Sequence, residues 1–312
     1  MRVFINFPVS KGALKLIKKE FNDLSITNIY KYADAYLIET EIPPVTSKVR
    51  IIQAITAGVN HIAMKGIPKD VVLCSNAGAY SDYVAEHAIA LLLSFYKKIP
   101  EKVGQMREGV FMPENVGTLK GKRIAIIGYG GIGKAVARLA KSFKMKVIAY
   151  GRKPNLADVN CDSYTTSLND IFGSDIYLIA LPYTKHTEGL VDDVILNKMG
   201  SNAILVNVAR AGIVKKESLI QYCKTNSEFY YITDVWWNEP NINKIPWKNI
   251  IATPHIAGGI SEQAFIEAFH SALSNIDLFF KGQQRNVVDR TEYEGLGGGT
   301  PALRKMIKSQ EK

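Results

Sequence analysis

Cysteine is scarce in this chain of 312 residues, and long apolar runs are missing. Its three cysteines, Cys74, Cys161 and Cys223, are odd in number and scattered, so they indicate neither a disulfide framework nor a metal site. We interpret them as reduced thiols and expect a cytoplasmic protein. The N-terminal residues enter a strand pattern at once, unlike a signal peptide, and no apolar stretch could cross a bilayer. We therefore expect no membrane association and no bound metal.

Acidic residues are outnumbered, since 39 Lys and Arg against 29 Asp and Glu give a net charge of +10 at pH 7. The cations are spread along expected helices and into the C-terminal tail RKMIKSQEK, and no recognised nucleic-acid-binding module appears. We interpret this charge as solvated surface that can attract phosphorylated or carboxylated ligands, with non-specific nucleic-acid binding as the alternative. No specific nucleic-acid partner is expected.

Short apolar segments alternate with helical patterns along the chain. A first group precedes residue 80, and a second begins at residue 123 with RIAIIG. The helix expected at 82–99 is apolar on more than one face, so we expect it to be buried between packed layers. After a helix at 261–281, the segment QRNVVD is predicted to return to the first group. The alternation predicts the α/β class, with parallel sheets and helices on both of their faces.

Residues 123–134 read RIAIIGYGGIGK, an apolar strand followed by a glycine-rich turn and an alanine-rich helix. Gly128 permits a tight turn, Gly130 lets a pyrophosphate approach the backbone, and Gly133 lets the helix pack close to the strand. The N–H groups and positive end of the helix at 132–143 would face the pyrophosphate. Because strand, helix and a second strand surround the motif, it predicts a dinucleotide site. We expect cofactor contacts from Gly128, Gly130, Gly131, Ile132 and Gly133.

The next strand, KVIAY, ends at Gly151, Arg152 and Lys153, where such sites often carry an acidic residue. A carboxylate there would bind the ribose hydroxyls of NAD and repel the 2′-phosphate of NADP. Arginine and lysine are instead suited to binding a phosphate. We therefore expect NADP in preference to NAD, with NAD possible; the alternative is that both cations are ordinary solvated loop charges.

Three polar residues, Arg210, Glu239 and His255, follow later strands, where open α/β sheets bind ligands. The Arg210 guanidinium can hold a carboxylate and polarise the neighbouring carbonyl. The His255 imidazole can protonate the carbonyl oxygen as a hydride arrives, and Glu239 can orient it. Together these residues predict catalysis. The remaining histidines have plainer interpretations; His87, on the apolar helix, is expected to be a satisfied core residue.

These residues lie within a series of motifs that resembles the D-isomer-specific 2-hydroxyacid dehydrogenase family from about residue 50 to residue 290. The motifs are TAGVNHI at 56–62, VAEHAIALLL at 84–93, GYGGIG at 128–133, LPYTKHTEGL at 181–190, NVARAGIV at 207–214, DVWWNEP at 234–240 and TPHIAGG at 253–259. The resemblance implies two Rossmann-like domains with the active site in the cleft between them. Residues 1–81 plus 282–312 would form a discontinuous, flavodoxin-like substrate-binding domain, and residues 82–281 the dinucleotide-binding domain. It also implies a homodimer.

Carried over position by position, the resemblance makes Arg210 the substrate-binding arginine, His255 the acid and base, and Glu239 its partner. Backbone N–H groups that would receive the substrate carboxylate belong to Ala57, Gly58 and Val59. Residues that would contact the cofactor are Pro182, Thr187 and Asp234, the last at the nicotinamide carboxamide. The chain departs from the family at Asn60, where an aspartate is common, and at Gly151, where NAD-using members have an acidic residue.

The expected activity is reduction of a small 2-oxo acid, of the glyoxylate or hydroxypyruvate type, by NADPH. The alternative within enzymes is an NAD-dependent phosphoglycerate or glycerate dehydrogenase. The alternative from another class is a nucleotide-sensing binding protein like the corepressors related to this family, which resemble the enzymes in Arg210, Glu239 and His255 too.

Overall fold

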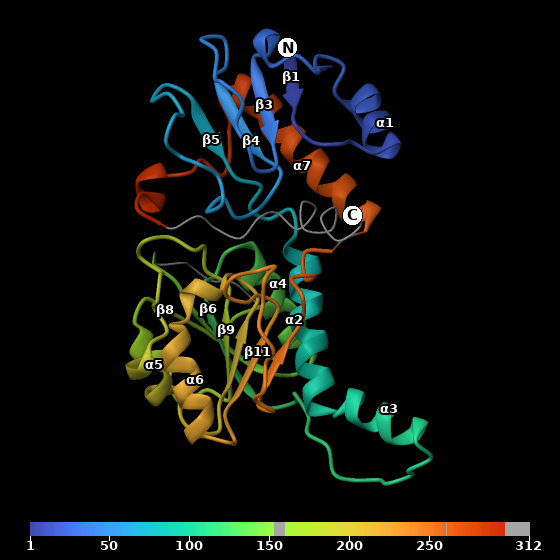
Figure 1. Ribbon diagram of the computed structural model, residues 1–312, viewed down its shortest axis with the longest axis vertical. Helices are drawn as coiled ribbons and strands as arrows, with labels where there is room; N and C mark the ends of the chain where they lie inside the picture. The colour runs from blue at the N-terminus through green and yellow to red at the C-terminus, as the bar shows by residue number, and fades with distance from the viewer. Residues whose placement is uncertain (153–159, 260, 297–312) are drawn as a thin grey trace.

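The computed structural model contains two β-sheets of parallel strands, and Figure 1 shows one sheet in the upper half of the molecule and the other in the lower half. The structure describes residues 1–152, 160–259 and 261–296. All strand pairs within the two sheets are parallel. Helices flank these sheets, so the predicted α/β class is confirmed.

The first sheet has five strands in the order β2-β1-β3-β4-β5, which is the order of flavodoxin-like folds. Its strands are β1 (Arg2–Ile5), β2 (Ser25–Thr27), β3 (Ala35–Ile38), β4 (Ile51–Ala54) and β5 (Val72–Cys74). Strands β3 and β4 are buried along their whole length, which explains why they read as continuous rather than alternating apolar runs. Helix α1 (Lys11–Glu20) and α7 (Glu262–Phe280) pack together on one face. Apolar side chains of the segment 59–71 cover the other.

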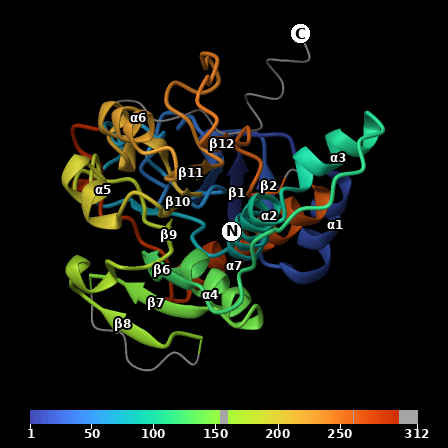
Figure 2. The same ribbon diagram turned by 90° about the horizontal axis from the view of Figure 1, so that it is seen from below.

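The second sheet has seven strands in the order β12-β11-β10-β9-β6-β7-β8. Its strands are β6 (Arg123–Ile127), β7 (Lys146–Tyr150), β8 (Ser163–Thr165), β9 (Ile176–Ile179), β10 (Ile204–Asn207), β11 (Tyr230–Thr233) and β12 (Ile250–Ala252). Its helices are α2 (Ser81–Tyr96), α4 (Gly131–Ser142), α5 (Asp193–Met199) and α6 (Lys216–Thr225). Figure 2 shows α2 and α4 on one face and α5 and α6 on the other, each pair covering its own buried cluster. The strand order reverses between β6 and β9, so their carboxyl ends form a topological switch point.

Helix α2 is buried in the layer against α4, as its all-round apolar pattern predicts. It ends at Tyr96, and α3 (Ile99–Arg107) follows after Lys98, whose φ of 51° lies in the left-handed region. Helix α3 and the loop after it project from the body of the molecule (Figure 1). Short 3₁₀ turns complete the described elements: Tyr30–Tyr32, Leu168–Ile171, Ala211–Ile213 and Arg290–Tyr293. No helix in the described ranges is long and apolar enough to cross a membrane.

Helix α7 packs on the first sheet, whereas we expected it within the dinucleotide-binding unit. Phe265, Phe269 and Leu273 lie in the same buried cluster as Val3 and Leu37 of the first sheet. The chain then runs beside β5, where the N–H of Val288 donates to the carbonyl of Leu73 at 2.8 Å. The unit around the first sheet is therefore built from both ends of the chain, and its C-terminal part begins at α7 rather than after it.

The two most buried cysteines, Cys74 and Cys223, lie in the cores of different units. Burial raises the pKa of the Cys74 thiol to about 11 and that of Cys223 to about 12. Both thiols are therefore protonated at neutral pH and are poor nucleophiles.

Candidate active site

The glycine turn after β6 has the close contacts that its sequence predicts. A Cβ on Gly128, whose φ is +106°, would lie 2.6 Å from the carbonyl oxygen of Ala180, and a Cβ on Gly133 would lie 2.1 Å from that of Gly128. Gly130 is the N-cap of α4, has no side-chain cap, and a Cβ there would meet no described atom within 4 Å. Gly130 therefore leaves room beside the uncapped N-terminus of α4, which fits a pyrophosphate.

The other two residues of the turn serve packing. A Cβ on Gly131 would lie 2.4 Å from the Ser81 hydroxyl oxygen, so this glycine lets the starts of α4 and α2 approach each other. Ile132 is half-buried and packs against the cluster beneath α2 and α4. The turn thus fixes the position of α4 as well as exposing its N-terminus.

The end of β7 differs in one respect from the sequence interpretation. A Cβ on Gly151 would lie 2.1 Å from the Tyr164 hydroxyl oxygen, so this hydroxyl stands where an acidic side chain would begin. Arg152 is exposed, but its Nη1 donates to Oε1 of Glu292 at 2.8 Å, and this bond raises the pKa of the guanidinium. Lys153 lies outside the described residues.

Pro182 and Thr187 belong to one turn after β9, beside the glycine turn. The Thr187 hydroxyl donates to the carbonyl oxygen of Pro182 at 2.7 Å. In the same turn, the N–H of Lys185 donates to the carbonyl oxygen of Glu292 at 2.9 Å. Glu292 therefore contacts both loops that are predicted to bind the cofactor, one through its backbone and the other through its carboxylate.

Arg210 follows β10 and reaches toward the first unit. Its Nε donates to Oδ1 of Asn60 at 3.2 Å, and its Nη1 donates to the carbonyl oxygen of Ala209 at 2.7 Å. Burial lowers the pKa of this guanidinium, although the negative charge of Glu239 partly offsets that effect. No carboxylate of the described chain lies within 4 Å of its nitrogen atoms. Arg210 thus presents a positive charge that forms no ion pair with any carboxylate in the described ranges.

The loop at 57–59 comes close to this guanidinium. A Cβ on Gly58 would lie 2.5 Å from Nη2 of Arg210, so glycine allows the approach. Val59 is buried in the first unit, and among the described residues the N–H groups of Ala57, Gly58 and Val59 donate to no acceptor. The structure therefore brings together Arg210 and the N–H groups that were predicted to receive a carboxylate.

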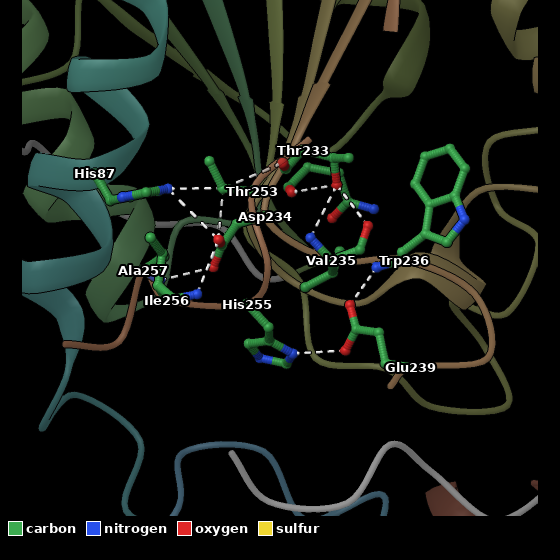
Figure 3. A network of polar contacts seen from close by, with 11 residues as sticks. His87, Thr233, Asp234, Val235, Trp236, Glu239, Thr253, His255, Ile256 and Ala257 are labelled. Atoms are coloured by element: carbon green, nitrogen blue, oxygen red, sulfur yellow. Dashed lines mark hydrogen bonds and ion pairs between the residues drawn. The ribbon is translucent and has the colours of Figure 1, made fainter. Parts of the chain in front are cut away.

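His255 and Glu239 form a direct pair (Figure 3). Nδ1 of the imidazole lies 2.8 Å from Oε2 of Glu239, whose side chain is only 9% exposed. The other carboxylate oxygen accepts the N–H of Trp236. Because the carboxylate accepts, we assign the proton of this contact to Nδ1. No described residue hydrogen-bonds to Nε2, which leaves that nitrogen for a ligand.

Asp234, after β11, is buried and holds the loop that carries His255. Its Oδ1 accepts the Thr253 hydroxyl at 2.6 Å and the N–H of Ile256 at 2.9 Å, and its Oδ2 accepts the N–H of Ala257 at 2.7 Å (Figure 3). Its predicted contact with the nicotinamide stays a prediction. No group of three His, Cys, Asp or Glu side chains in the described ranges could hold a metal ion.

The chain matches the model of a known protein family. The model of a family described as "D-isomer specific 2-hydroxyacid dehydrogenase, NAD binding domain" matches residues 89–257, more than half of the chain. The chain belongs to this family. The recognition of the family from its motifs is therefore confirmed, and the chain is an oxidoreductase, a D-2-hydroxyacid dehydrogenase that uses a nicotinamide cofactor.

Similar proteins agree with this assignment. Glyoxylate reductase of Thermococcus litoralis is 28% identical over 90% of this chain and 94% of its own length. Hydroxypyruvate reductase of Thermotoga maritima is 27% identical over 84% of this chain and 92% of its own length. Among solved structures, a glycerate dehydrogenase related protein from Thermoplasma acidophilum is 42% identical in sequence and superposes with a TM-score of 0.70. The match covers 90% of this chain and all of the other protein's chain.

Sequence reasoning missed two contacts that reach the site. Asn60 was noted only as a departure from the family, and Glu292 was not singled out. Neither has a local signal, because each meets its partner arginine across a long stretch of sequence.

The contact between Asn60 and Arg210 generates a first prediction. Replacement of Asn60 by alanine removes the acceptor that orients the guanidinium, so KM for the acid substrate should rise roughly tenfold, since a hydrogen bond to a charged group contributes about 1.5–3 kcal/mol. Asn60→Asp keeps an acceptor oxygen and should preserve KM within a few-fold. Steady-state kinetics of both variants, with Asn202→Ala at an exposed loop as control, would check this. An unchanged KM in Asn60→Ala would contradict it.

Proposed function

We propose that the chain reduces a small 2-oxo acid, of the glyoxylate or hydroxypyruvate type, with NADPH, and catalyses the reverse oxidation of the D-2-hydroxy acid. The observation that carries this proposal is the meeting of Arg210 with the loop at 57–59, next to the pair of His255 and Glu239. A carboxylate acceptor and a proton donor at one site are what reduction of a 2-oxo acid requires.

Each residue has a distinct task in this proposal. Arg210 and the N–H groups at 57–59 bind the substrate carboxylate, and the same guanidinium polarises the carbonyl. His255 donates a proton to the carbonyl oxygen and accepts it in the reverse direction, while Glu239 keeps the imidazole oriented. When bound, the nicotinamide supplies the hydride. Contact of the two units around the substrate would exclude water.

The choice of substrate rests on the names of the relatives, because the chain spans almost their whole length. An NAD-dependent phosphoglycerate or glycerate dehydrogenase is the alternative within the family. The two classes differ in substrate size and charge, so a panel of acids distinguishes them.

The preference for NADP rests on the end of β7. The Tyr164 hydroxyl stands where an acidic residue at 151 would begin, and the neighbouring Arg152 offers an exposed guanidinium. We infer that the 2′-phosphate of NADP takes the place of the Glu292 carboxylate on Arg152. Lys153 would add a second charge.

Two further proposals concern organisation. We propose that the first sheet, with the C-terminal segment, is the substrate-binding domain and that the second sheet is the dinucleotide-binding domain. We also propose a homodimer, supported by large apolar side chains that are exposed on α3 and the projecting loop: Ile99, Val103, Met106, Val110, Phe111 and Met112. Phe111 is 80% exposed, and a second copy of the chain would shield it. A cytoplasmic location stays a prediction.

The activity is tested by following NADPH and NADH oxidation with a panel of 2-oxo acids that includes glyoxylate, hydroxypyruvate and a phosphorylated acid. His255→Ala should lower kcat about 10²- to 10⁴-fold, the usual contribution of a general acid. NADPH affinity, measured by nucleotide fluorescence, should change little. His270→Ala is the matched control, because His270 pairs with Glu20 on the exposed surface. Turnover that survives in His255→Ala would contradict the proposal, and tight nucleotide binding without turnover of any acid would favour the sensing protein.

Arg152 and Glu292 test the cofactor preference. Arg152→Ala should raise KM for NADPH roughly tenfold and leave KM for NADH unchanged, because only NADP carries the 2′-phosphate. Glu292→Gln should lower KM for NADPH about two- to fivefold, since it removes a competing exposed ion pair. Arg138→Ala, which breaks an exposed pair with Asp82, is the control. Equal or better use of NADH by the unmodified enzyme would refute the role of Arg152.

Light scattering tests the homodimer. The enzyme should have about twice the chain mass of 34.6 kDa. Phe111→Asp places a charge in the proposed interface and should shift the protein toward the monomer. Val194→Asp, at an exposed apolar residue of α5, should have no such effect. A monomeric unmodified protein would disprove the proposed assembly.

A further inference from the structure

Helix α2 places one imidazole, that of His87, against the ends of β11 and β12. Nε2 of His87 lies 3.0 Å from the Thr253 hydroxyl oxygen and 3.5 Å from Oδ1 of Asp234 (Figure 3). We propose that His87 is a positioning residue. Its Nε2–H donates a hydrogen bond to the Thr253 hydroxyl, which in turn binds Asp234, and this chain of bonds fixes the backbone that carries His255. The inference rests on the proposed role of His255 as proton donor.

The direction of the hydrogen bonds follows from the Thr253 hydroxyl, which has a single proton. Its oxygen lies 2.6 Å from Oδ1 of Asp234 and 3.4 Å from the carbonyl oxygen of Thr233, so the proton goes to the carboxylate. The hydroxyl oxygen can then only accept from His87. Nε2 of His87 therefore carries a proton, and it completes a chain of donors that ends on Asp234.

Asp234 in turn determines an unusual backbone at His255. The φ of His255 is +54°, a left-handed conformation that side chains with a Cβ rarely adopt. The two peptide N–H groups that follow it, of Ile256 and Ala257, point to the two oxygens of the Asp234 carboxylate. These bonds hold the turn in that conformation, and the turn aims the imidazole at Glu239.

His87 supplies what the turn itself lacks. Asp234 is only 1% exposed, and the Thr253 hydroxyl is one of its three donors. His87 satisfies the oxygen of that hydroxyl and so fixes the direction in which Thr253 donates to Asp234. His87 comes from a helix that also packs along α4, the helix of the glycine turn. The same helix therefore sets the position of the cofactor helix and of the proton donor relative to each other.

A pair of variants tests the proposal by kinetics. His87→Ala removes the donor and should lower kcat about 10- to 100-fold, since a small displacement of a catalytic group has effects of this size. KM for NADPH should stay within about threefold, because the glycine turn is untouched. In His87→Gln the amide nitrogen replaces Nε2 as a donor, and kcat should recover to within about threefold of the unmodified enzyme. Undiminished kcat in His87→Ala, or equal loss in both variants, would overturn the proposal.

Amide hydrogen exchange tests the same proposal without activity. The N–H groups of Ile256 and Ala257 should exchange at least about tenfold faster in His87→Ala, whereas His87→Gln should retain their protection. His270→Ala is the control for loss of an imidazole elsewhere. If the unmodified chain reduces no 2-oxo acid, the proposed function fails, but the exchange rates still decide the role of His87. Equal protection in His87→Ala and the unmodified chain would refute it.

Discussion

Parallel pairing of the seven strands in the second sheet is the constraint on which the site depends, because it turns every carboxyl end toward one edge. The chain passes from β8 to β9 across β6, so the loops after β6 and β9 diverge and leave room for a ligand. The glycine turn follows β6, and the segments with Arg210, Asp234 and His255 follow β10, β11 and β12. Residues that are far apart in sequence therefore lie at the same edge of the sheet as the glycine turn.

The charged groups at this edge offset the free-energy cost of their desolvation in different ways. Asp234 accepts three hydrogen bonds from its own surroundings, and Glu239 divides its oxygens between His255 and the N–H of Trp236. Arg210 has only neutral acceptors in the described chain, and burial lowers its pKa. A half-buried cation that forms no ion pair with a described residue favours an anionic ligand. Electrostatics at Arg210 thus accounts for a carboxylate-bearing substrate independently of any relative's name.

Features that depend on neighbouring residues could be predicted from the sequence. The roles of Gly128 and Gly133 could be predicted because the contacts that exclude a Cβ at these positions arise within one strand-turn-helix unit or between adjacent strand ends. The pairing of His255 with Glu239 was expected because both follow later strands of the chain and because the family resemblance makes Glu239 the partner of His255; the structure confirms the contact. Helix α7 shows the limit. Its spacing of apolar residues reveals a buried face but not which sheet covers it, and the covering strands lie at the opposite end of the chain.

Contacts between the two units could not be predicted from the sequence either, because a single hydrogen bond produces no periodic pattern of residues. Asn60 binds Arg210 at the substrate end, and Glu292 binds Arg152 and the N–H of Lys185 at the cofactor end. Both contacts come from the first unit and are polar, and the exposed pair of Glu292 and Arg152 can exchange with water at a small net free energy. Polar contacts of this kind are typical of interfaces between domains that move relative to each other. An anion at either arginine would then alter the contact that holds the units together.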